Sequence, residues 1–171
     1  MPRHEKQSFL PARRTQDHLT TTVEGVDNPI SAFHPPLELA AYTFSHDIRV
    51  RFVETDAMGI VHHSNYLHYL EVTRVEFLRS IGHPYSANRE AGLDAAVLEC
   101  RVRYLVPLRF DDVVTVHLRL AGATRATFTI EYLLTVDGRT TTIAGTQHAF
   151  VTSDGRPRRV PEWLRQLSGL P

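Results

Sequence analysis

Residues 53–71 read VETDAMGIVHHSNYLHYLE, and they bring together a loop aspartate, a glycine, two adjacent histidines and the beginning of an apolar helix. The Asp56 carboxylate could attack a carbonyl carbon, or activate a water molecule that does so. A helix N-terminus presents unpaired N–H groups, which stabilise the negative charge that develops on a carbonyl oxygen. This order of residues is compatible with chemistry at a carbonyl group. Taken alone, however, it favours the structural alternative, an Asp56 that only accepts hydrogen bonds from nearby amides, because aspartates are common in loops.

The two histidines offer a second kind of chemistry, which their spacing does not favour. A helical zinc site needs two histidines four residues apart with a glutamate beside the first, whereas His62 and His63 are adjacent and His68 follows after five residues. We therefore predict no metal. His63 could act as a base, but no G-x-S-x-G elbow supplies a nucleophile for it to activate. A third possibility is that His63 contributes mainly through its backbone N–H.

Three other side chains near this stretch have ordinary structural explanations. Glu71 and Arg74 are three residues apart on the expected helix, so a surface ion pair explains them. Tyr66 could line an acyl or aromatic pocket, although aromatic residues on a buried helix face more often belong to the core. The chain has no G-x-G-x-x-G, P-loop or cysteine pair, so no nucleotide-binding unit or zinc module is predicted.

The elements that position these residues follow from hydrophobic periodicity. Apolar residues alternate with polar ones from Phe44 to Phe52, which predicts a half-buried strand. A loop follows over residues 55–64. Apolar residues at three- and four-residue steps then predict a helix over 65–81, with Ser64 or Asn65 as its N-cap and Gly82 as its end. Its broad apolar face indicates a helix covered on more than one side.

Four further strand-like segments follow the helix, at residues 95–106, 113–122, 126–136 and 140–152. Apolar and polar residues alternate in the first three, and Leu98 falls in the apolar row of the first. The Asp137-Gly138 pair before the last segment is a strong signal for a two-residue hairpin turn. Residues 154–167 predict a turn and a short helix with Pro161 near its first position. Short connections favour antiparallel pairing, so the pattern predicts an α+β domain in which one long helix packs on an antiparallel sheet.

Composition limits the function classes. The 171 residues carry 19 basic and 19 acidic side chains, so neither nucleic acid nor an anionic membrane is an expected partner of the whole surface. No apolar segment approaches the length of a membrane span, and the first residues lack the apolar core of a secretory signal. The single cysteine, Cys100, suits a reducing compartment such as the cytoplasm. Residues 1–41 hold five of the ten prolines and predict an arm, flexible or docked on a partner subunit, before a domain at 42–171.

The stretch TDAMGIVHHSNYLHYLE resembles the hotdog-fold thioesterases of the 4-hydroxybenzoyl-CoA thioesterase type. It is most similar to the bacterial acyl-CoA thioesterases with a D-x-x-G-[IV]-V-x-[HY]-x-N-Y pattern. The residues that fit this pattern are Asp56, Gly59, Ile60, Val61, His63, Asn65 and Tyr66. The tail DGRPRRVP also resembles the closing turn of the family, and the likeness runs from about residue 42 to 168.

The resemblance implies a five-stranded antiparallel sheet curled around the helix, and a homodimer or homotetramer with active sites between subunits. It implies hydrolysis of acyl-CoA or aroyl-CoA thioesters without a cofactor. Asp56 would be the nucleophile or general base, and the His63 N–H would be the oxyanion donor. Gly59, Ile60, Val61 and Tyr66 would contact the substrate.

The resemblance also places basic residues near the CoA phosphates, in the hairpin that reads AGATRATF here. Arg125 is the matching residue, and an ordinary solvated turn is its alternative. His62 stands where many relatives carry an aromatic residue. Two other functions stay open, namely a thioesterase for acyl carrier protein and a hotdog protein that binds acyl thioesters without turnover.

Overall fold

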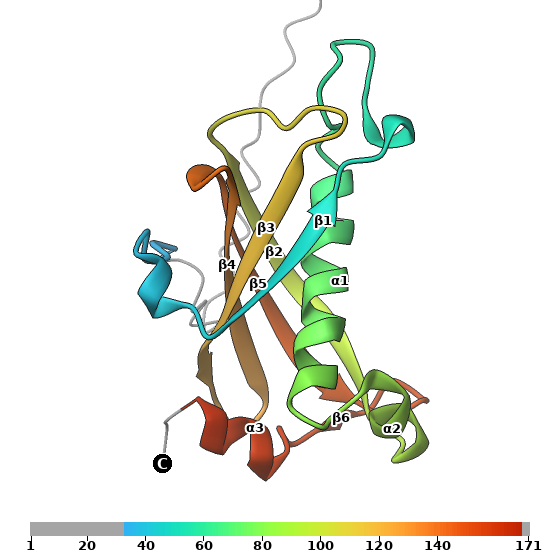
Figure 1. The fold of residues 1–171 in the computed structure, drawn as a ribbon. Coiled ribbons are helices and arrows are strands. Elements are labelled where there is room, and N and C mark those ends of the chain that lie inside the picture. Colours follow the sequence, from blue (N-terminus) through green and yellow to red (C-terminus); the bar gives the residue numbers. More distant parts are fainter. Residues whose placement is uncertain (1–32, 169–171) are drawn as a thin grey trace, which may run out of the picture.

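The computed structural model describes residues 33–168, in which an antiparallel sheet curls beside one long helix (Figure 1). The strands are β1 (Phe44–Arg49), β2 (Asp94–Tyr104), β3 (Val113–Ala123), β4 (Thr127–Val136), β5 (Arg139–Val151) and β6 (Pro157–Arg158). The helices are α1 (Asn65–Ser80), α2 (Tyr85–Glu90) and α3 (Glu162–Leu167), with two 3₁₀ segments, η1 (Leu39–Ala41) and η2 (Phe52–Glu54). The predicted order of one strand, a long helix and four strands is confirmed.

Antiparallel pairing joins the strands in the order β1-β3-β4-β5-β2, and the short β6 pairs with β5. The predicted hairpin turn forms between β4 and β5, where Asp137 and Gly138 both have positive φ angles of 49° and 75°. Two successive positive φ angles are the geometry of the type I′ turn, which matches the twist of paired strands. This order leaves β2 at one side of the sheet, with its outer edge unpaired within the described residues.

Helix α1 packs against β1 and β3 (Figure 1), and the apolar residues of its buried face belong to the hydrophobic core. The buried residues are Tyr66, Tyr69, Leu70, Thr73, Arg74, Phe77 and Leu78. Leu67, which the periodicity predicts as apolar core, is instead 46% exposed. The helix ends as expected at Gly82, whose φ of +79° is a left-handed conformation that glycine adopts without strain.

Two strand predictions need correction. Strand β1 ends at Arg49, because the Val50 N–H and C=O bond to Asp112 and Asp111 and the chain then turns into η2. Phe52 is therefore 76% exposed and does not continue the buried row. In β2 the register shifts between Val97 and Glu99, so a bulge interrupts the predicted alternation.

The arm predicted for residues 1–41 lies mostly outside the described residues. In its last part, residues 33–41, Phe33 packs against β5 of the same chain. A Cβ atom at Gly145 of β5 would lie 2.6 Å from Cε2 of Phe33, so the glycine permits this close approach. The Tyr42 hydroxyl donates a hydrogen bond of 2.8 Å to the Pro36 carbonyl.

One histidine is part of the core. His148 of β5 is 1% exposed, and its ring stacks on Phe128 with a centroid distance of 4.9 Å. Burial, together with the nearby Arg74 guanidinium, lowers the pKa of His148 to about 3. The folded protein therefore holds this ring in its neutral form.

We predict that His148 makes the protein sensitive to mild acid. Its pKa is depressed on folding, so the unfolded chain binds more protons between about pH 6.5 and pH 3. The free energy of unfolding should be intact above pH 6.5 and fall below it, by at most about 1.4 kcal/mol per pH unit from this one group. Urea unfolding from pH 7 to pH 5 measures the slope. His148→Gln should flatten it, and an unchanged slope in that variant would rule out this residue.

Candidate active site

The Asp56 loop is a small closed turn. Thr55 and Val61 form an isolated antiparallel bridge, and the Asp56 N–H donates to the Ile60 carbonyl at 2.9 Å. Gly59 has a φ of +71°, and its N–H donates to the Asp56 carbonyl. The Met58 N–H donates to Asp56 Oδ1 at 2.8 Å, so one carboxylate oxygen braces the loop. Asp56 Oδ2 accepts no hydrogen bond within the described residues.

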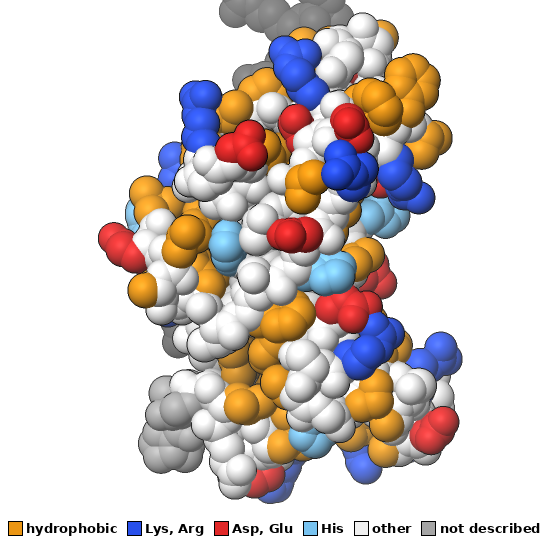
Figure 2. All heavy atoms as spheres, viewed as in Figure 1, with side chains coloured by type: hydrophobic (Ala, Val, Ile, Leu, Met, Phe, Trp, Pro, Cys, Tyr) orange, Lys and Arg blue, Asp and Glu red, His pale blue; other side chains and the backbone are white. Residues whose placement is uncertain are grey.

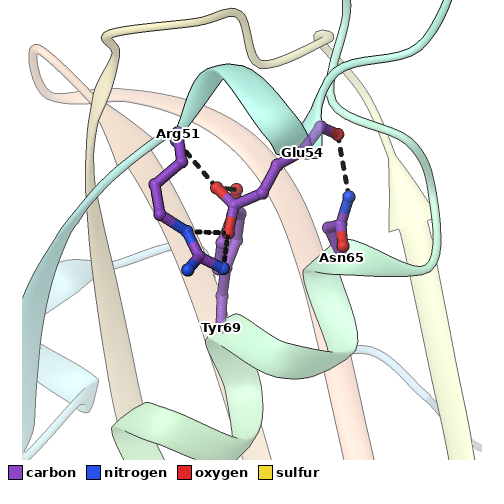
Figure 3. Close-up of polar contacts among 4 residues, drawn as sticks. All are labelled: Arg51, Glu54, Asn65 and Tyr69. Atoms are coloured by element: carbon purple, nitrogen blue, oxygen red, sulfur yellow. Dashed lines mark hydrogen bonds and ion pairs between the residues drawn. The ribbon is translucent and has the colours of Figure 1, made fainter.

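A buried carboxylate fixes the base of this loop. Glu54 is 4% exposed, and its carboxylate accepts hydrogen bonds from the Arg51 N–H, the Arg51 guanidinium and the Tyr69 hydroxyl at 2.7–2.9 Å (Figure 3). Burial alone would raise the pKa of Glu54, but these hydrogen bonds and the Arg51 charge together hold it below its usual range. Glu54 is not among the residues that the sequence pattern predicts for the site, although Arg51 and Glu54 are three residues apart beside the loop.

The Glu54 backbone ties the same loop to the start of α1. Its carbonyl accepts the Asn65 side-chain amide at 2.8 Å, as Figure 3 shows, and the His62 N–H at 2.9 Å. Asn65 is the first residue of α1 and not its N-cap, so its role is to hold the loop against the helix. Ser64 occupies the N-cap position without a capping hydrogen bond from its side chain.

The structure gives the two histidines different surroundings. His62 Nδ1 lies 2.8 Å from Ser64 Oγ, which explains why this hydroxyl does not cap the helix. The His63 carbonyl accepts the Tyr104 hydroxyl at 3.1 Å, which connects the start of α1 to the end of β2. Among residues 33–168, no hydrogen bond uses the His63 N–H. An unpaired amide therefore stands at the start of α1, two residues before its first helical residue.

The other predicted substrate contacts are partly structural. Val61 and Tyr66 are each 3% exposed, and both bond to the main chain of Leu108: the Val61 N–H donates to its carbonyl and the Tyr66 hydroxyl accepts its N–H. These contacts hold the loop between β2 and β3 against the site. Gly59 is exposed and Ile60 half-buried, so both are accessible to a ligand.

Exposed apolar side chains surround the Asp56 loop. Phe52, Val53 and Met58 are 76–79% exposed, and the Phe52 ring packs edge-on against Phe110 at 5.6 Å. Figure 2 shows hydrophobic side chains gathered at the upper right, over η2 and the loop that follows it, with basic side chains beside them. Asp56 thus lies beside an apolar surface that suits an apolar ligand or a second protein.

Arg125 does not join the other predicted residues within one chain. It lies in the turn between β3 and β4, where its carbonyl accepts the Val160 N–H just before α3. Helix α3 is at the bottom of Figure 1 and the Asp56 loop at the top. Strand β3 separates these two ends, and its 11 residues span roughly 35 Å.

Burial decides the roles of the Glu71–Arg74 pair and of Cys100. The predicted Glu71–Arg74 ion pair is wrong: Glu71 is exposed, whereas Arg74 is 7% exposed and its Nη1 has no partner within residues 33–168. Burial raises the pKa of the Cys100 thiol, which disfavours the thiolate that a nucleophile needs. Residues 33–168 contain no cluster of three His, Cys, Asp or Glu that could hold a metal ion, and none of their helices meets the length and hydropathy of a membrane span.

We predict that Tyr69→Phe destabilises the protein through Glu54. The substitution keeps the ring but removes the hydroxyl that donates to the buried carboxylate, and hydrogen bonds to charged groups contribute about 1.5–3 kcal/mol. Denaturant unfolding should show a loss of this size. Glu76→Gln, which changes an acid on the outer face of α1, is the control and should shift the midpoint far less. Equal midpoint shifts in the two variants would mean that the hydrogen bond from Tyr69 to Glu54 adds no stability.

Comparison with known proteins places this chain in a family. The model of the Thioesterase-like superfamily matches residues 50–167. The acyl-CoA thioesterase YbgC of Haemophilus influenzae is 33% identical over 92 residues, which cover 53% of this chain and 68% of that protein.

Solved structures agree with the family match. A hypothetical protein from Aquifex aeolicus is 42% identical with a TM-score of 0.70, over 73% of this chain and 98% of its own. A Thermus thermophilus thioesterase solved with coenzyme A and Zn is 27% identical with a TM-score of 0.65, over 77% of this chain and 98% of its own. The expected hotdog fold is confirmed, and this chain belongs to the Thioesterase-like superfamily.

Proposed function

We propose that this protein hydrolyses acyl-CoA or aroyl-CoA thioesters to the free acid and CoA, with Asp56 as the reacting carboxylate. The observation that carries the proposal is that the loop before α1 holds two groups without a full set of partners. Within the described chain, one oxygen of Asp56 accepts no hydrogen bond and the His63 N–H donates none. The superfamily supports thioester chemistry, and its YbgC relative from Haemophilus influenzae is named an acyl-CoA thioesterase.

The reaction needs two contributions from these residues. The His63 N–H donates to the thioester oxygen, and the positive end of the α1 dipole favours the charge that develops there. Asp56 Oδ2 either removes a proton from a water that attacks the carbonyl carbon, or attacks it directly and forms an anhydride that water then opens. In both routes the C–S bond breaks, a C–O bond forms, and the two hydrogens of water end on the acid and the thiol.

The complete site in this proposal requires two copies of the chain. The outer edge of β2 is unpaired within residues 33–168, and Val97 and Leu98 on that strand are both 55% exposed. An exposed strand edge with apolar side chains is a template for pairing with another strand. Antiparallel pairing of β2 with its own copy reverses the second sheet, so the end that carries Arg125 in one copy comes to the end that carries Asp56 in the other.

We predict that Asp56→Asn abolishes most of the activity but leaves the fold intact. Asparagine keeps the side-chain oxygen that accepts the Met58 N–H, yet it cannot act as a base or nucleophile. The kcat for thiol release from an aroyl-CoA and an octanoyl-CoA substrate should fall roughly 10²–10⁴-fold at an unchanged melting temperature.

The controls for this experiment separate side chain from main chain. Asp154→Asn changes an exposed turn acid and should leave kcat as it is in the wild type. His63→Ala keeps the backbone N–H and should cost much less than Asp56→Asn. Near wild-type thiol release by Asp56→Asn would refute the role of Asp56, and an equally large loss in His63→Ala would restore the imidazole as a catalytic group.

We predict that Leu98→Glu dissociates the dimer and removes activity with it. A two-fold axis across β2 would bring the two introduced carboxylates near each other, where like charges repel. Sedimentation velocity at micromolar concentration should show the wild type as a dimer or larger and the variant as a monomer. Leu167→Glu on α3 is the matched control, because Leu167 is 52% exposed and lies away from β2. A Leu98→Glu variant that stays assembled would exclude this edge as the interface.

A further inference from the structure

A pocket of about 280 Å³ lies between α1 and the strands β2, β4 and β5. One part of its lining is apolar and includes Leu67 and Leu70 of α1 and Val97 of β2. The other part is polar and consists of Arg74, Tyr132, Thr146 and His148. The Asp56 mechanism uses none of these polar groups. A pocket with an apolar wall and a few convergent polar groups is the usual form of a site for a small ligand.

Arg74 is the strongest sign that this pocket is built for a ligand. Its side chain comes from the middle of α1, is 93% buried and carries a permanent charge, yet its Nη1 has no hydrogen-bond partner within residues 33–168. A buried guanidinium is normally paired with a carboxylate, because an unpaired charge in the interior is costly. Glu71 also lines the pocket but is exposed and does not pair with Arg74.

His148 adds a second unsatisfied group beside Arg74. Its Nε2 lies 2.7 Å from Thr146 Oγ1, which in turn donates to the Tyr132 hydroxyl at 3.4 Å. His148 Nδ1 is buried and has no partner within the described chain. Because Thr146 Oγ1 donates onward, the neutral ring donates its Nε2 proton to Thr146, and Nδ1 is left as a hydrogen-bond acceptor. Of the two buried atoms, Arg74 Nη1 is therefore the one that can donate to an acidic group in the pocket.

The pocket begins close to the proposed reaction site. Leu67 is four residues after His63 and Arg74 is eleven residues after it, which along the axis of α1 corresponds to roughly 6 Å and 16 Å. Helix side chains lean toward the N-terminus, so the Arg74 side chain reaches back along this path. An acyl chain whose carbonyl oxygen accepts the His63 N–H can therefore pass Leu67 and Leu70 and end beside Arg74.

We propose that this pocket binds the acyl chain and that Arg74 selects chains that end in a carboxylate. The substrate class is then the CoA monothioesters of dicarboxylic acids, and the inference rests on the thioester hydrolysis proposed above. A carboxylate matches the planar fork of a guanidinium and neutralises its charge, which a terminal hydroxyl would not do. The exposed carboxylate of Glu71 at the mouth of the pocket repels the carboxylate of such a ligand, and water weakens this repulsion.

Three substrates with eight carbons test this selection. The kcat/KM for octanedioyl-CoA should exceed that for octanoyl-CoA at least tenfold in the wild type, with 8-hydroxyoctanoyl-CoA between them. In Arg74→Met the preference for the carboxylate should disappear, while octanoyl-CoA is hydrolysed at least as well as before. A loss of the same factor on all three substrates, or a wild type that prefers octanoyl-CoA, would overturn the proposal.

Two variants on the same helix sharpen the test. Arg79→Met removes an exposed arginine of α1 and should leave the substrate preference unchanged. Glu71→Gln removes the opposing charge and should raise the preference for octanedioyl-CoA further. If Glu71→Gln lowered that preference instead, Glu71 would be the partner of Arg74 and the pocket would not select acids.

A binding measurement keeps this inference separate from the proposed function. Free octanedioate should raise the melting temperature of the wild-type protein more than octanoate does, and Arg74→Lys should weaken that difference. If neither CoA ester is hydrolysed but octanedioate still stabilises the protein selectively, the hydrolysis proposal fails and the pocket assignment stands. Equal shifts with the two acids would refute the pocket assignment, whatever the outcome of the hydrolysis assay.

Discussion

The buried carboxylate of Glu54 is the interaction on which the candidate site depends. Its side chain binds Arg51 and Tyr69, and its main chain binds His62 and Asn65, so one residue connects the end of β1 to the first turns of α1 (Figure 3). These contacts act together with those of Val61 and Tyr66 to Leu108, which hold the same loop and helix start from the other side of the chain. A displacement of about 1 Å between reacting groups is costly for catalysis, so rigidity here has a chemical purpose.

Much of the fold follows from short-range patterns. Asp137 and Gly138 adopt the positive φ angles of a type I′ turn, and Gly82 ends α1, because both positions depend on the conformational freedom of the residues themselves. Burial alternates as expected in the first part of each central strand, through Leu118 in β3 and through Tyr132 in β4. The Asp56 loop and the start of α1 lie together as expected, because they are close in sequence.

Features that depend on contacts between residues far apart in sequence could not be predicted from short-range patterns. The bulge in β2 depends on pairing with β5, so Leu98 leaves the predicted buried row. Arg74 has the spacing of a surface ion pair with Glu71, yet the width of the buried face of α1 encloses it. Arg125 follows a family position, but its distance from Asp56 depends on the direction in which β3 crosses the sheet. The role of Glu54 arises from Tyr69, which is 15 residues later.

The buried polar groups of the pocket are difficult to explain by stability alone. A neutral His148 beside an Arg74 whose Nη1 has no partner within residues 33–168 destabilises the folded state, and apolar residues of similar volume would pack there at lower cost. Proteins can keep such groups where function requires them, because selection tolerates a destabilising residue as long as the total stability stays above a threshold. The core of this protein combines an apolar layer that packs the sheet against α1 with a polar end that contains Arg74 and His148. Under the proposed function, Arg74 selects the substrate from within the core, and Asp56 reacts with it from the loop that Glu54 holds.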